Sequence, residues 1–194
     1  MGLVRIVGGA LRGRKLRVLD HGVRPTSDRT REAIFDILGP NTVAGARVLD
    51  LYAGTGALGT EALSRGAASA DFVDADRAVA RNLEESLAEL GLDGVARVHL
   101  SDLDRGLPTG LRGPWDLVFL DPPYDGDAGA RWVESVAQGG LLGANGILVY
   151  ERRKGSDAPA PAGLTLRTDR IYGDTAVAFY RVDVPEGRPG QGGV

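Results

Sequence analysis

The segment Asp121-Pro122-Pro123-Tyr124 holds the residues whose types and spacing are best suited to chemistry. Its two prolines form a stiff turn directly after the apolar run 117–120, at the point where a strand would end. An exocyclic amine on a nucleobase is a weak nucleophile, because its lone pair is delocalised into the ring. Asp121 and the Pro122 carbonyl could accept its two N–H groups and favour a pyramidal nitrogen, while Tyr124 stacks on the base. We therefore expect residues 121–124 to be catalytic; the alternative is a turn that only ends a strand.

A glycine-rich loop at 50–59 follows another apolar run, and residues 54–59 match G-x-G-x-x-G. Such glycines bring the backbone close to a ligand at a helix N-terminus, which serves a dinucleotide pyrophosphate or a nucleoside equally well. The acid at the strand end helps to decide between them. Asp50 precedes the loop, where its carboxylate would repel a pyrophosphate but could bind an ammonium group, directly or through water.

Further acids stand where the next two strands should end. Asp74 and Asp76 are placed for ribose hydroxyls, and Asp102 could accept from an adenine amino group. Acids on three successive strand ends indicate an adenosyl ligand that carries positive charge, although Asp76 and Asp102 could instead only cap helices. The residues expected to bind this cofactor are Asp50, Tyr52, Ala53, Gly54, Thr55, Gly56, Asp74, Ala75, Asp76, Asp102, Leu103 and Asp121.

The elements that must position these residues alternate between strand and helix, which predicts an α/β fold with a doubly wound parallel sheet. Ligands of such sheets bind at the carboxyl ends of the strands, where the motifs above fall. A closing antiparallel hairpin is expected around Gly173-Asp174. Strands are predicted at 48–51, 70–73, 95–100, 117–120, 147–150, 164–171 and 175–182, and helices at 57–64, 77–90, 128–137 and from a cap within 26–28 to 38, where Gly39-Pro40 ends the helix.

Charge is unevenly distributed along the chain. Residues 1–31 carry a net charge of +6 and the remainder −9, for a total of −3. This division predicts a basic arm over 1–25 that binds a polyanion, attached to a catalytic domain over 26–184. The Gly/Pro-rich composition of residues 185–194 predicts a disordered tail. The segments 5–7 and 15–18 should form a small hairpin or an extended arm, which should be mobile because it has too little apolar surface for its own core. Its candidate polyanion contacts are Arg5, Arg12, Arg14, Lys15, Arg17, Arg24 and Arg29, unless the arginines are only a solvated charge run.

Several classes of function are disfavoured by composition. The chain has no cysteine, which excludes a thiol nucleophile, a Cys-ligated zinc site and an iron–sulfur cluster, and fits a cytoplasmic location. Because His21 and His99 lie in dissimilar contexts, no metal is expected. The first residues carry Arg5 and no long apolar stretch, so neither a secretory signal nor a membrane span is predicted.

Two strings resemble known enzymes. D-L-Y-A-G-T-G-A-L-G-T-E-A-L-S-R-G-A at 50–67 and D-P-P-Y at 121–124 resemble the class I S-adenosylmethionine-dependent methyltransferases that modify exocyclic amines. The match narrows with three further segments, which resemble the bacterial methyltransferases of guanine N2 in small-subunit (16S) ribosomal RNA. These are R-I-V-G-G-A-L-R-G-R-K-L at 5–16, R-P-T-S-D-R-T-R-E-A-I-F-D-I-L at 24–38 and Y-G-D-T at 172–175.

The resemblance implies a seven-stranded Rossmann-like fold, S-adenosylmethionine as cofactor and an RNA-binding N-terminal arm. It also implies methyl transfer to one guanine of 16S RNA, within the small subunit or an assembly intermediate, by a protein expected to be monomeric. By this likeness Asp50, Gly54 and Gly56 would hold the methionine end, Asp74 the ribose and Asp102 the adenine, while residues 121–124 receive a flipped guanine.

Two alternatives remain on chemistry alone. D-P-P-Y does not distinguish guanine from adenine or RNA from DNA, so a methyltransferase of DNA or of another RNA is the nearer one. A chain of 194 residues leaves little room for a separate target-recognition domain, which favours RNA recognised by shape. An NAD-dependent oxidoreductase would share the fold and the glycine motif, but it would leave D-P-P-Y without a purpose.

Overall fold

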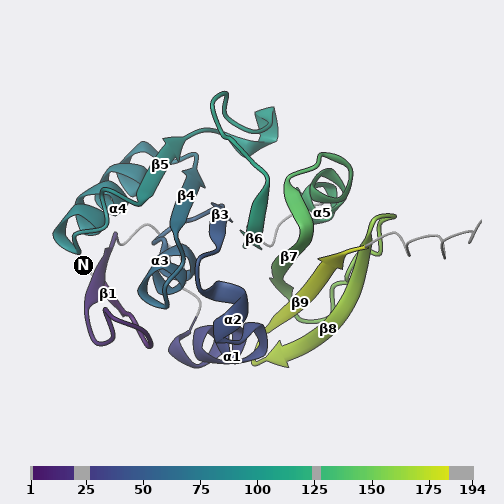
Figure 1. The fold of residues 1–194 in the computed structure, drawn as a ribbon, viewed down its shortest axis with the longest axis horizontal. Coiled ribbons are helices and arrows are strands. Elements are labelled where there is room, and N and C mark those ends of the chain that lie inside the picture. The colour runs from purple at the N-terminus through teal and green to yellow at the C-terminus, as the bar shows by residue number, and fades with distance from the viewer. Residues whose placement is uncertain (1, 20–26, 124–127, 184–194) are drawn as a thin grey trace, which may run out of the picture.

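The computed structural model describes residues 2–19, 27–123 and 128–183, so the expectations for Arg24, Tyr124 and the tail 185–194 lie outside the described residues (Figure 1). Seven strands form one sheet, and two more pair as a separate hairpin. The strands of the sheet are β3 (Arg47–Leu51), β4 (Ser69–Asp74), β5 (Ala96–Leu100), β6 (Trp115–Leu120), β7 (Leu142–Arg153), β8 (Leu164–Tyr172) and β9 (Thr175–Val182).

The order of these strands is β5-β4-β3-β6-β7-β9-β8. The first five are parallel, and β9 runs antiparallel between β7 and β8. The strand order reverses between β3 and β6, which makes their carboxyl ends the switch point of the sheet. The predicted seven-stranded, mostly parallel sheet with a closing hairpin is confirmed.

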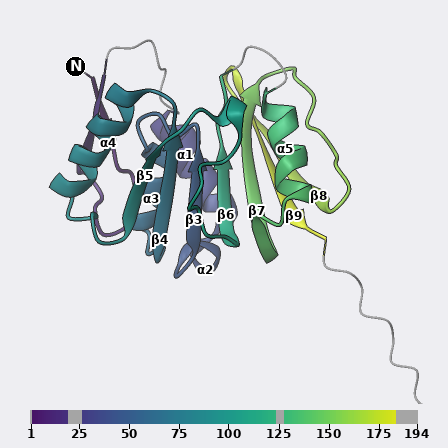
Figure 2. The ribbon, with the colours of Figure 1, turned by 90° about the horizontal axis from the view of Figure 1, so that it is seen from above.

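Two apolar clusters cover the two faces of the sheet. Leu117 and Phe119 of β6 pack on one face, together with α1 (Asp28–Leu38), α2 (Pro40–Val43), α3 (Ala57–Ser64) and α4 (Arg77–Glu89). Val118 and Leu120 face the other side, where α5 (Ala128–Gln138) packs. Figure 2 shows the two groups of helices, with α4 towards the β5 side and α5 towards β7. Strands with apolar side chains on both faces are typical of a parallel sheet buried by helices.

The helix α1 begins and ends where its sequence signals predict. The Ser27 hydroxyl accepts from the Thr30 backbone N–H at 3.1 Å, so Ser27 is the N-cap among the three candidates. Gly39 ends the helix with a φ of 72°. Pro40 then starts the four-residue α2, which was not predicted from the sequence although proline suits the first position of a helix.

The N-terminal arm consists of β1 (Gly2–Arg5) and β2 (Lys15–Val18), paired antiparallel. The first strand therefore lies at 2–5 and not at 5–7. Four arm side chains are buried with Ala57 and Leu90 of the catalytic domain in one apolar cluster. The prediction of a mobile arm is wrong for the described residues 2–19, because apolar side chains of the arm and of the catalytic domain form one shared core. These four side chains are Val4, Ile6, Leu16 and Val18.

Candidate active site

Four acids lie at the carboxyl ends of four adjacent parallel strands. Asp102 follows β5, Asp74 ends β4, Asp50 belongs to β3 and Asp121 follows β6. The register pairs Leu51 of β3 with Leu120 of β6, so the sheet itself brings the glycine loop and the Asp121 turn together at the switch point. The structure thus assembles the acids that the sequence singles out.

The glycine loop presses the start of α3 against the sheet. Tyr52, Gly54 and Gly56 all have positive φ values, of 58°, 53° and 70°. Left-handed backbone at a non-glycine residue such as Tyr52 is uncommon and clusters at functional sites. A Cβ on Gly59 would lie 2.4 Å from the Phe72 ring, so this third glycine of the motif permits close packing of helix on strand.

Asp50 and Asp74 both hold this loop through its backbone. The Gly59 N–H donates to Asp50 Oδ2 at 2.9 Å, and the Gly54 N–H donates to Asp74 Oδ2 at 2.7 Å. Asp74 Oδ1 also accepts from the Asp76 N–H at 2.9 Å. A carboxylate has about four lone-pair sites, so Asp74 keeps acceptor capacity for a ligand hydroxyl.

Asp76 and Asp102 serve as helix caps. Asp76 Oδ1 accepts from the backbone N–H groups of Ala78 and Val79 at the start of α4. Asp102 Oδ1 accepts from the Asp104 N–H at the start of a short 3₁₀ turn, Leu103–Arg105. The capping role considered for these two acids is real, and their contact with a cofactor stays a prediction.

The site gathers acidic side chains whose ionised forms are disfavoured until a cation binds. Asp50 is only 2% exposed, and burial, with a smaller contribution from Asp121 and Asp74, raises its pKa to about 8 against the Gly59 hydrogen bond. Burial also raises the pKa of Asp121, to about 7. No salt bridge in the described part of the chain involves Asp50, Asp74 or Asp121. Such a site fits a cationic ligand far better than a pyrophosphate.

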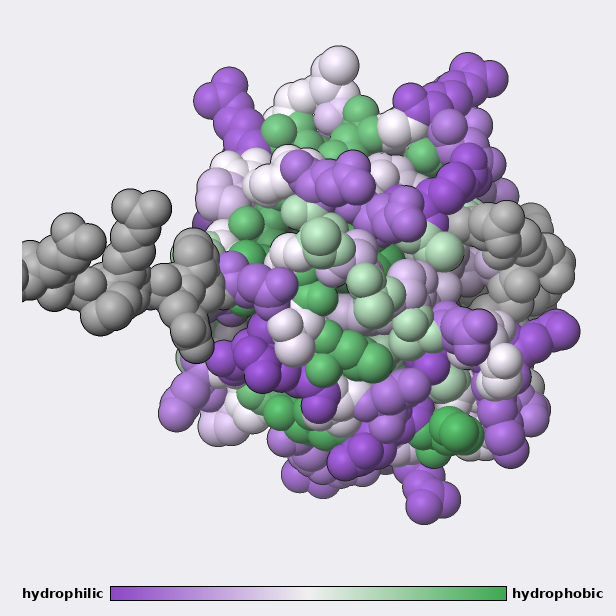
Figure 3. All heavy atoms as spheres, turned by 90° about the vertical axis from the view of Figure 1, so that its right-hand side faces the viewer, coloured by the Kyte–Doolittle hydropathy of each residue, from purple (hydrophilic) through white to green (hydrophobic). Residues whose placement is uncertain are grey.

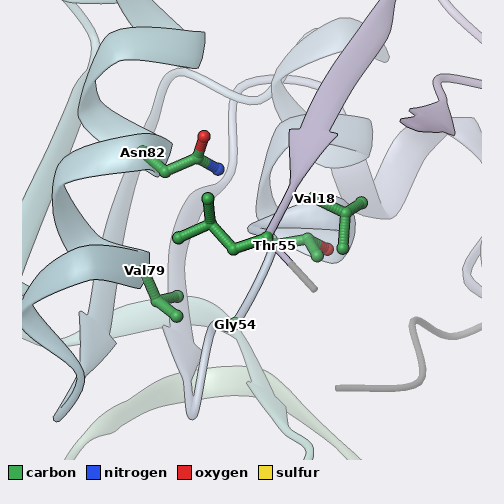
Figure 4. A pocket seen from close by; sticks show the side chains of 6 residues that line it. Val18, Gly54, Thr55, Val79 and Asn82 are labelled. Atoms are coloured by element: carbon green, nitrogen blue, oxygen red, sulfur yellow. The ribbon is translucent and has the colours of Figure 1, made fainter. Parts of the chain in front are cut away.

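A hollow lies beside the glycine loop, and the arm forms one of its walls (Figure 4). Asn82 of α4 fixes this wall by donating from Nδ2 to the Arg17 carbonyl at 2.8 Å. Sequence reasoning missed this contribution, because it treated the arm as separate from the cofactor loop. The hollow is lined by Val18, Leu19, Gly54, Thr55, Val79 and Asn82.

The basic turn of the arm lies away from this edge of the sheet. Helices α3 and α4 both begin at the carboxyl edge, whereas the arm's Leu11 contacts Ser64 at the far end of α3 and Arg14 donates to the Glu89 carbonyl at the far end of α4. Eight helical residues span about 12 Å. Arg12, Arg14 and Lys15 are therefore about one helix length from the four acids.

Other arm cations are partly neutralised by the catalytic domain. Arg17 pairs with Glu89 at 2.9 Å, and Arg5 pairs with Asp28 at 3.4 Å. By contrast, Arg12, Lys15 and Arg29 are exposed and make no ion pair within the described residues. Fewer cations are therefore available to bind a polyanion than the sequence indicates, but Arg12, Lys15 and Arg29 remain available.

Comparison with known proteins agrees with this geometry. Residues 4–181 match the model of the family described as "Conserved hypothetical protein 95". The chain belongs to that family. It is 36% identical over 182 residues to "Ribosomal RNA small subunit methyltransferase D" of Escherichia coli K12, covering 93% of this chain and 90% of that protein. It is also 36% identical to "Putative rRNA methyltransferase YlbH" of Bacillus subtilis, covering 92% and 98%.

Solved structures of similar proteins share the fold. "Putative methyltransferase yhhF from Escherichia coli" superposes with a TM-score of 0.84 at 38% identity, covering 94% of this chain and 99% of that one. An RNA methyltransferase from Salinibacter ruber, solved with S-adenosyl-L-homocysteine, has a TM-score of 0.62 at 14% identity, covering 86% and 97%, and shows the shared fold alone. The expected class I methyltransferase architecture and the expected family are confirmed.

The described residues contain no cluster of three or more His, Asp or Glu side chains that could hold a metal ion. The same part of the chain has no helix long and apolar enough to cross a bilayer.

Proposed function

We propose that this member of the family transfers a methyl group from S-adenosylmethionine to the exocyclic N2 of a guanine in 16S ribosomal RNA. The observation that carries the proposal is the Asp121-Pro122-Pro123 turn at the switch point, beside the buried Asp50 carboxyl, which has no cationic partner among the described residues. Relatives of similar length that are named as ribosomal RNA methyltransferases support the choice of substrate.

The acids at the strand ends are suited to the cofactor, which supplies an electrophilic methyl group on a sulfonium ion. Asp50 and the backbone of the loop at Gly54 and Gly56 would hold its charged methionine end. Asp74, with acceptor capacity to spare, would bind the ribose, and Asp102 would accept from the adenine amine. The hydrogen bond from the Gly59 N–H would keep the buried carboxylate of Asp50 in a fixed orientation for this role.

Asp121 and the Pro122 carbonyl would receive the two N–H groups of the target amine. Both acceptors favour a pyramidal nitrogen, whose lone pair then attacks the methyl carbon as the carbon–sulfur bond breaks. The nitrogen becomes acidic once it is methylated, so its proton can leave to water and no strong base is needed. Tyr124 would stack on the flipped guanine and hold its amine in line with the methyl group.

The proposed partner is 16S RNA in the small subunit or in an assembly intermediate, which places the reaction in the cytoplasm. Arm cations and Arg29 would contact its phosphates, so that the acidic catalytic domain can approach a polyanion.

A methyl-transfer assay with radiolabelled S-adenosylmethionine tests the proposal. The substrates to compare are naked 16S RNA, small subunits that lack the modification and DNA of the same sequence, each followed by nucleoside analysis of the product. We expect N2-methylguanosine from RNA or subunits and none from DNA. Transfer to DNA, or to a different atom of RNA, would overturn the substrate assignment, and binding of NAD in place of S-adenosylmethionine would overturn the reaction.

A further inference from the structure

A buried carboxylate on α3 fastens the arm through its backbone. Glu61 is fully buried, and its Oε2 accepts from the Val7 N–H at 2.9 Å. Its Oε1 accepts from Arg65 Nε at 2.8 Å, and the Arg65 guanidinium lies 4.8 Å from the centre of the Phe35 ring. A buried charge is tolerated only when it is paired and hydrogen-bonded, so the arm completes the environment that Glu61 requires.

Ser64, one turn further along α3, fastens the next part of the arm. Its hydroxyl donates to the Gly8 carbonyl at 2.6 Å and accepts from the Leu11 N–H at 2.9 Å. Its backbone carbonyl accepts from the Ala10 N–H at 2.7 Å. Four hydrogen-bonding positions of the arm, between residues 7 and 11, are thus held by one side of one helix.

Close approach at this contact explains the glycine pair of the arm. A Cβ on Gly8 would lie 2.4 Å from Arg65 Nη2, and a Cβ on Gly9 would lie 1.9 Å from the Ser64 carbonyl oxygen. Gly9 also has a φ of 74°, which side chains rarely adopt. A side chain at position 8 would therefore have to displace the Arg65 guanidinium, and one at position 9 would collide with the backbone of α3. We call Glu61, Ser64 and Arg65 the seat of the arm.

The other end of the hairpin is fastened independently. Arg31 of α1, which is 1% exposed, donates from Nη2 to the Arg5 carbonyl at 2.7 Å, and Asn82 of α4 holds the Arg17 carbonyl. Apolar packing alone would bury the hairpin. The seat holds the segment 7–11 that leads into the basic turn, and the turn itself is closed by hydrogen bonds between Ile6 and Arg14, from Gly13 to Ile6, and from Arg14 to the Glu89 carbonyl.

We propose that Glu61 and Ser64 are positioning residues for RNA, which hold the turn containing Arg12, Arg14 and Lys15 as a rigid phosphate-binding surface. This inference rests on the proposed function. Cations on a loose turn would have to be ordered when RNA binds, and that reduction in conformational freedom would weaken binding. A turn that is already fixed avoids this cost, and it keeps its charges at a constant distance from the four acids of the active site.

Two seat variants separate positioning from charge. Ser64→Ala removes two hydrogen bonds to the arm, whereas Glu61→Gln keeps an acceptor for Val7 and loses only the pairing with Arg65. The matched controls are Ser135→Ala and Glu134→Gln, on the exposed side of α5. Affinity for a 16S RNA transcript over a salt series, affinity for S-adenosylmethionine, and amide exchange at Val7 and Leu11 are measured for each protein.

We expect Ser64→Ala to lose exchange protection at Leu11 and to bind RNA about tenfold more weakly, as removal of two hydrogen bonds of ordinary strength would give. Its KM for RNA should rise with kcat nearly unchanged, and its affinity for S-adenosylmethionine should stay within about twofold. The dependence of RNA affinity on salt should keep its slope, because every cation remains. Glu61→Gln should show a smaller effect in the same direction.

Folded seat variants that bind RNA as tightly as the parent protein would refute the positioning role and leave the proposed function intact. A parallel loss of cofactor affinity and RNA affinity would also refute it, since the seat would then only stabilise the fold. If Glu61→Gln does not fold, Ser64→Ala alone decides. A parent protein that binds neither the 16S RNA transcript nor small subunits would refute the proposed function, and the positioning role with it.

Discussion

Asp50 is buried at the switch-point edge of the sheet, where the neighbouring Asp121 adds to the effect of burial in disfavouring its ionised form, and burial disfavours the ionised form of Asp121 as well. In an ordinary core, this arrangement would only cost stability. At a binding site the same arrangement favours a cationic ligand, because a positive charge offsets the repulsion between the two carboxylates and stabilises both ionised forms. The same residues can therefore select the cofactor and orient the amine.

Replacing Asp121 by Ala should separate catalysis from binding. The carboxylate is needed most as the amine becomes pyramidal, so kcat should fall at least about 100-fold while cofactor affinity changes far less. Single-turnover kinetics and calorimetry measure the two effects. Asp93→Ala, at an exposed position, is the matched control. Near-normal turnover by Asp121→Ala would remove Asp121 from the proposed mechanism.

The raised pKa values predict a dependence of stability on pH. Burial raises the pKa of Asp50 to about 8 and that of Asp121 to about 7 in the folded protein, against an ordinary value of 3.8. The folded state then binds more protons than the unfolded state between these limits, so the free energy of unfolding should fall as pH rises from about 4 to 8. Thermal melts of the ligand-free protein across this range check the sign.

Cofactor binding should reverse this trend. A cationic ligand favours the ionised carboxylates, so binding should release protons and should tighten from about pH 6 to pH 8. Calorimetry in two buffers of different ionisation enthalpy measures the protons released. Uptake of protons on binding would show that the two carboxylates do not face the positive charge.

At the scale of elements, the arm behaves as part of the catalytic domain. Leu16 is 1% exposed in the cluster shared with α3 and the end of α4, so Leu16→Ala should lower the free energy of unfolding by about 2–4 kcal/mol. Leu3 of the same hairpin is 58% exposed, and Leu3→Ala should change it by less than about 0.5 kcal/mol. Urea unfolding distinguishes them. Equal, small effects would mean that the arm unfolds on its own.

The central strands could be predicted from sequence because strands buried on both faces are continuous apolar runs. The strand β7 shows the limit of that signal. Its apolar part is 147–150, but pairing with β6 and β9 extends it to Leu142–Arg153, through Gly146 and Glu151. Charged and glycine residues carry no strand signal by themselves, so long-range pairing had to supply it.

One part of the candidate site could likewise be predicted from the sequence, and another part could not. Acids at strand ends could be brought together from the sequence, because a parallel sheet aligns the ends of its strands. The seat could not, since Glu61 and Ser64 resemble ordinary polar residues of a helix surface and their partners lie more than 50 positions away. The one signal in the sequence was that Glu61 is the only charged residue of α3, among apolar and small polar residues.

At the scale of the whole molecule, ion pairs between the arm and the catalytic domain reduce the separation of positive and negative charge seen in the sequence. Arg17 meets Glu85 and Glu89, and Asp28 meets both Arg5 and Arg31. The face of the molecule at β8 presents a mixture of polar and apolar side chains (Figure 3). There Leu166 and Ile171 are exposed among Arg167, Asp169 and Arg170, charges that protect an edge strand from pairing with another chain.

The remaining exposed cations of the arm predict a measurable ionic contribution to RNA binding. Each phosphate bound by Arg12 or Lys15 releases a counterion, so Arg12→Ala with Lys15→Ala should make the logarithmic salt dependence of affinity shallower. The expected change is about 0.7 for each phosphate of single-stranded RNA that the variant no longer neutralises. Both side chains are exposed, so stability and cofactor binding should be retained, which deletion of the packed arm could not ensure.

The control for this measurement is Arg97→Ala with Arg112→Ala, an equal loss of exposed charge away from the arm. If both pairs change the slope equally, RNA responds to the net charge of the molecule and the arm has no special place in binding. If only the arm pair changes it, phosphates lie along the arm while guanine occupies the edge of the sheet. The bound RNA must then extend at least the length of α3, about 12 Å, from its methylated base.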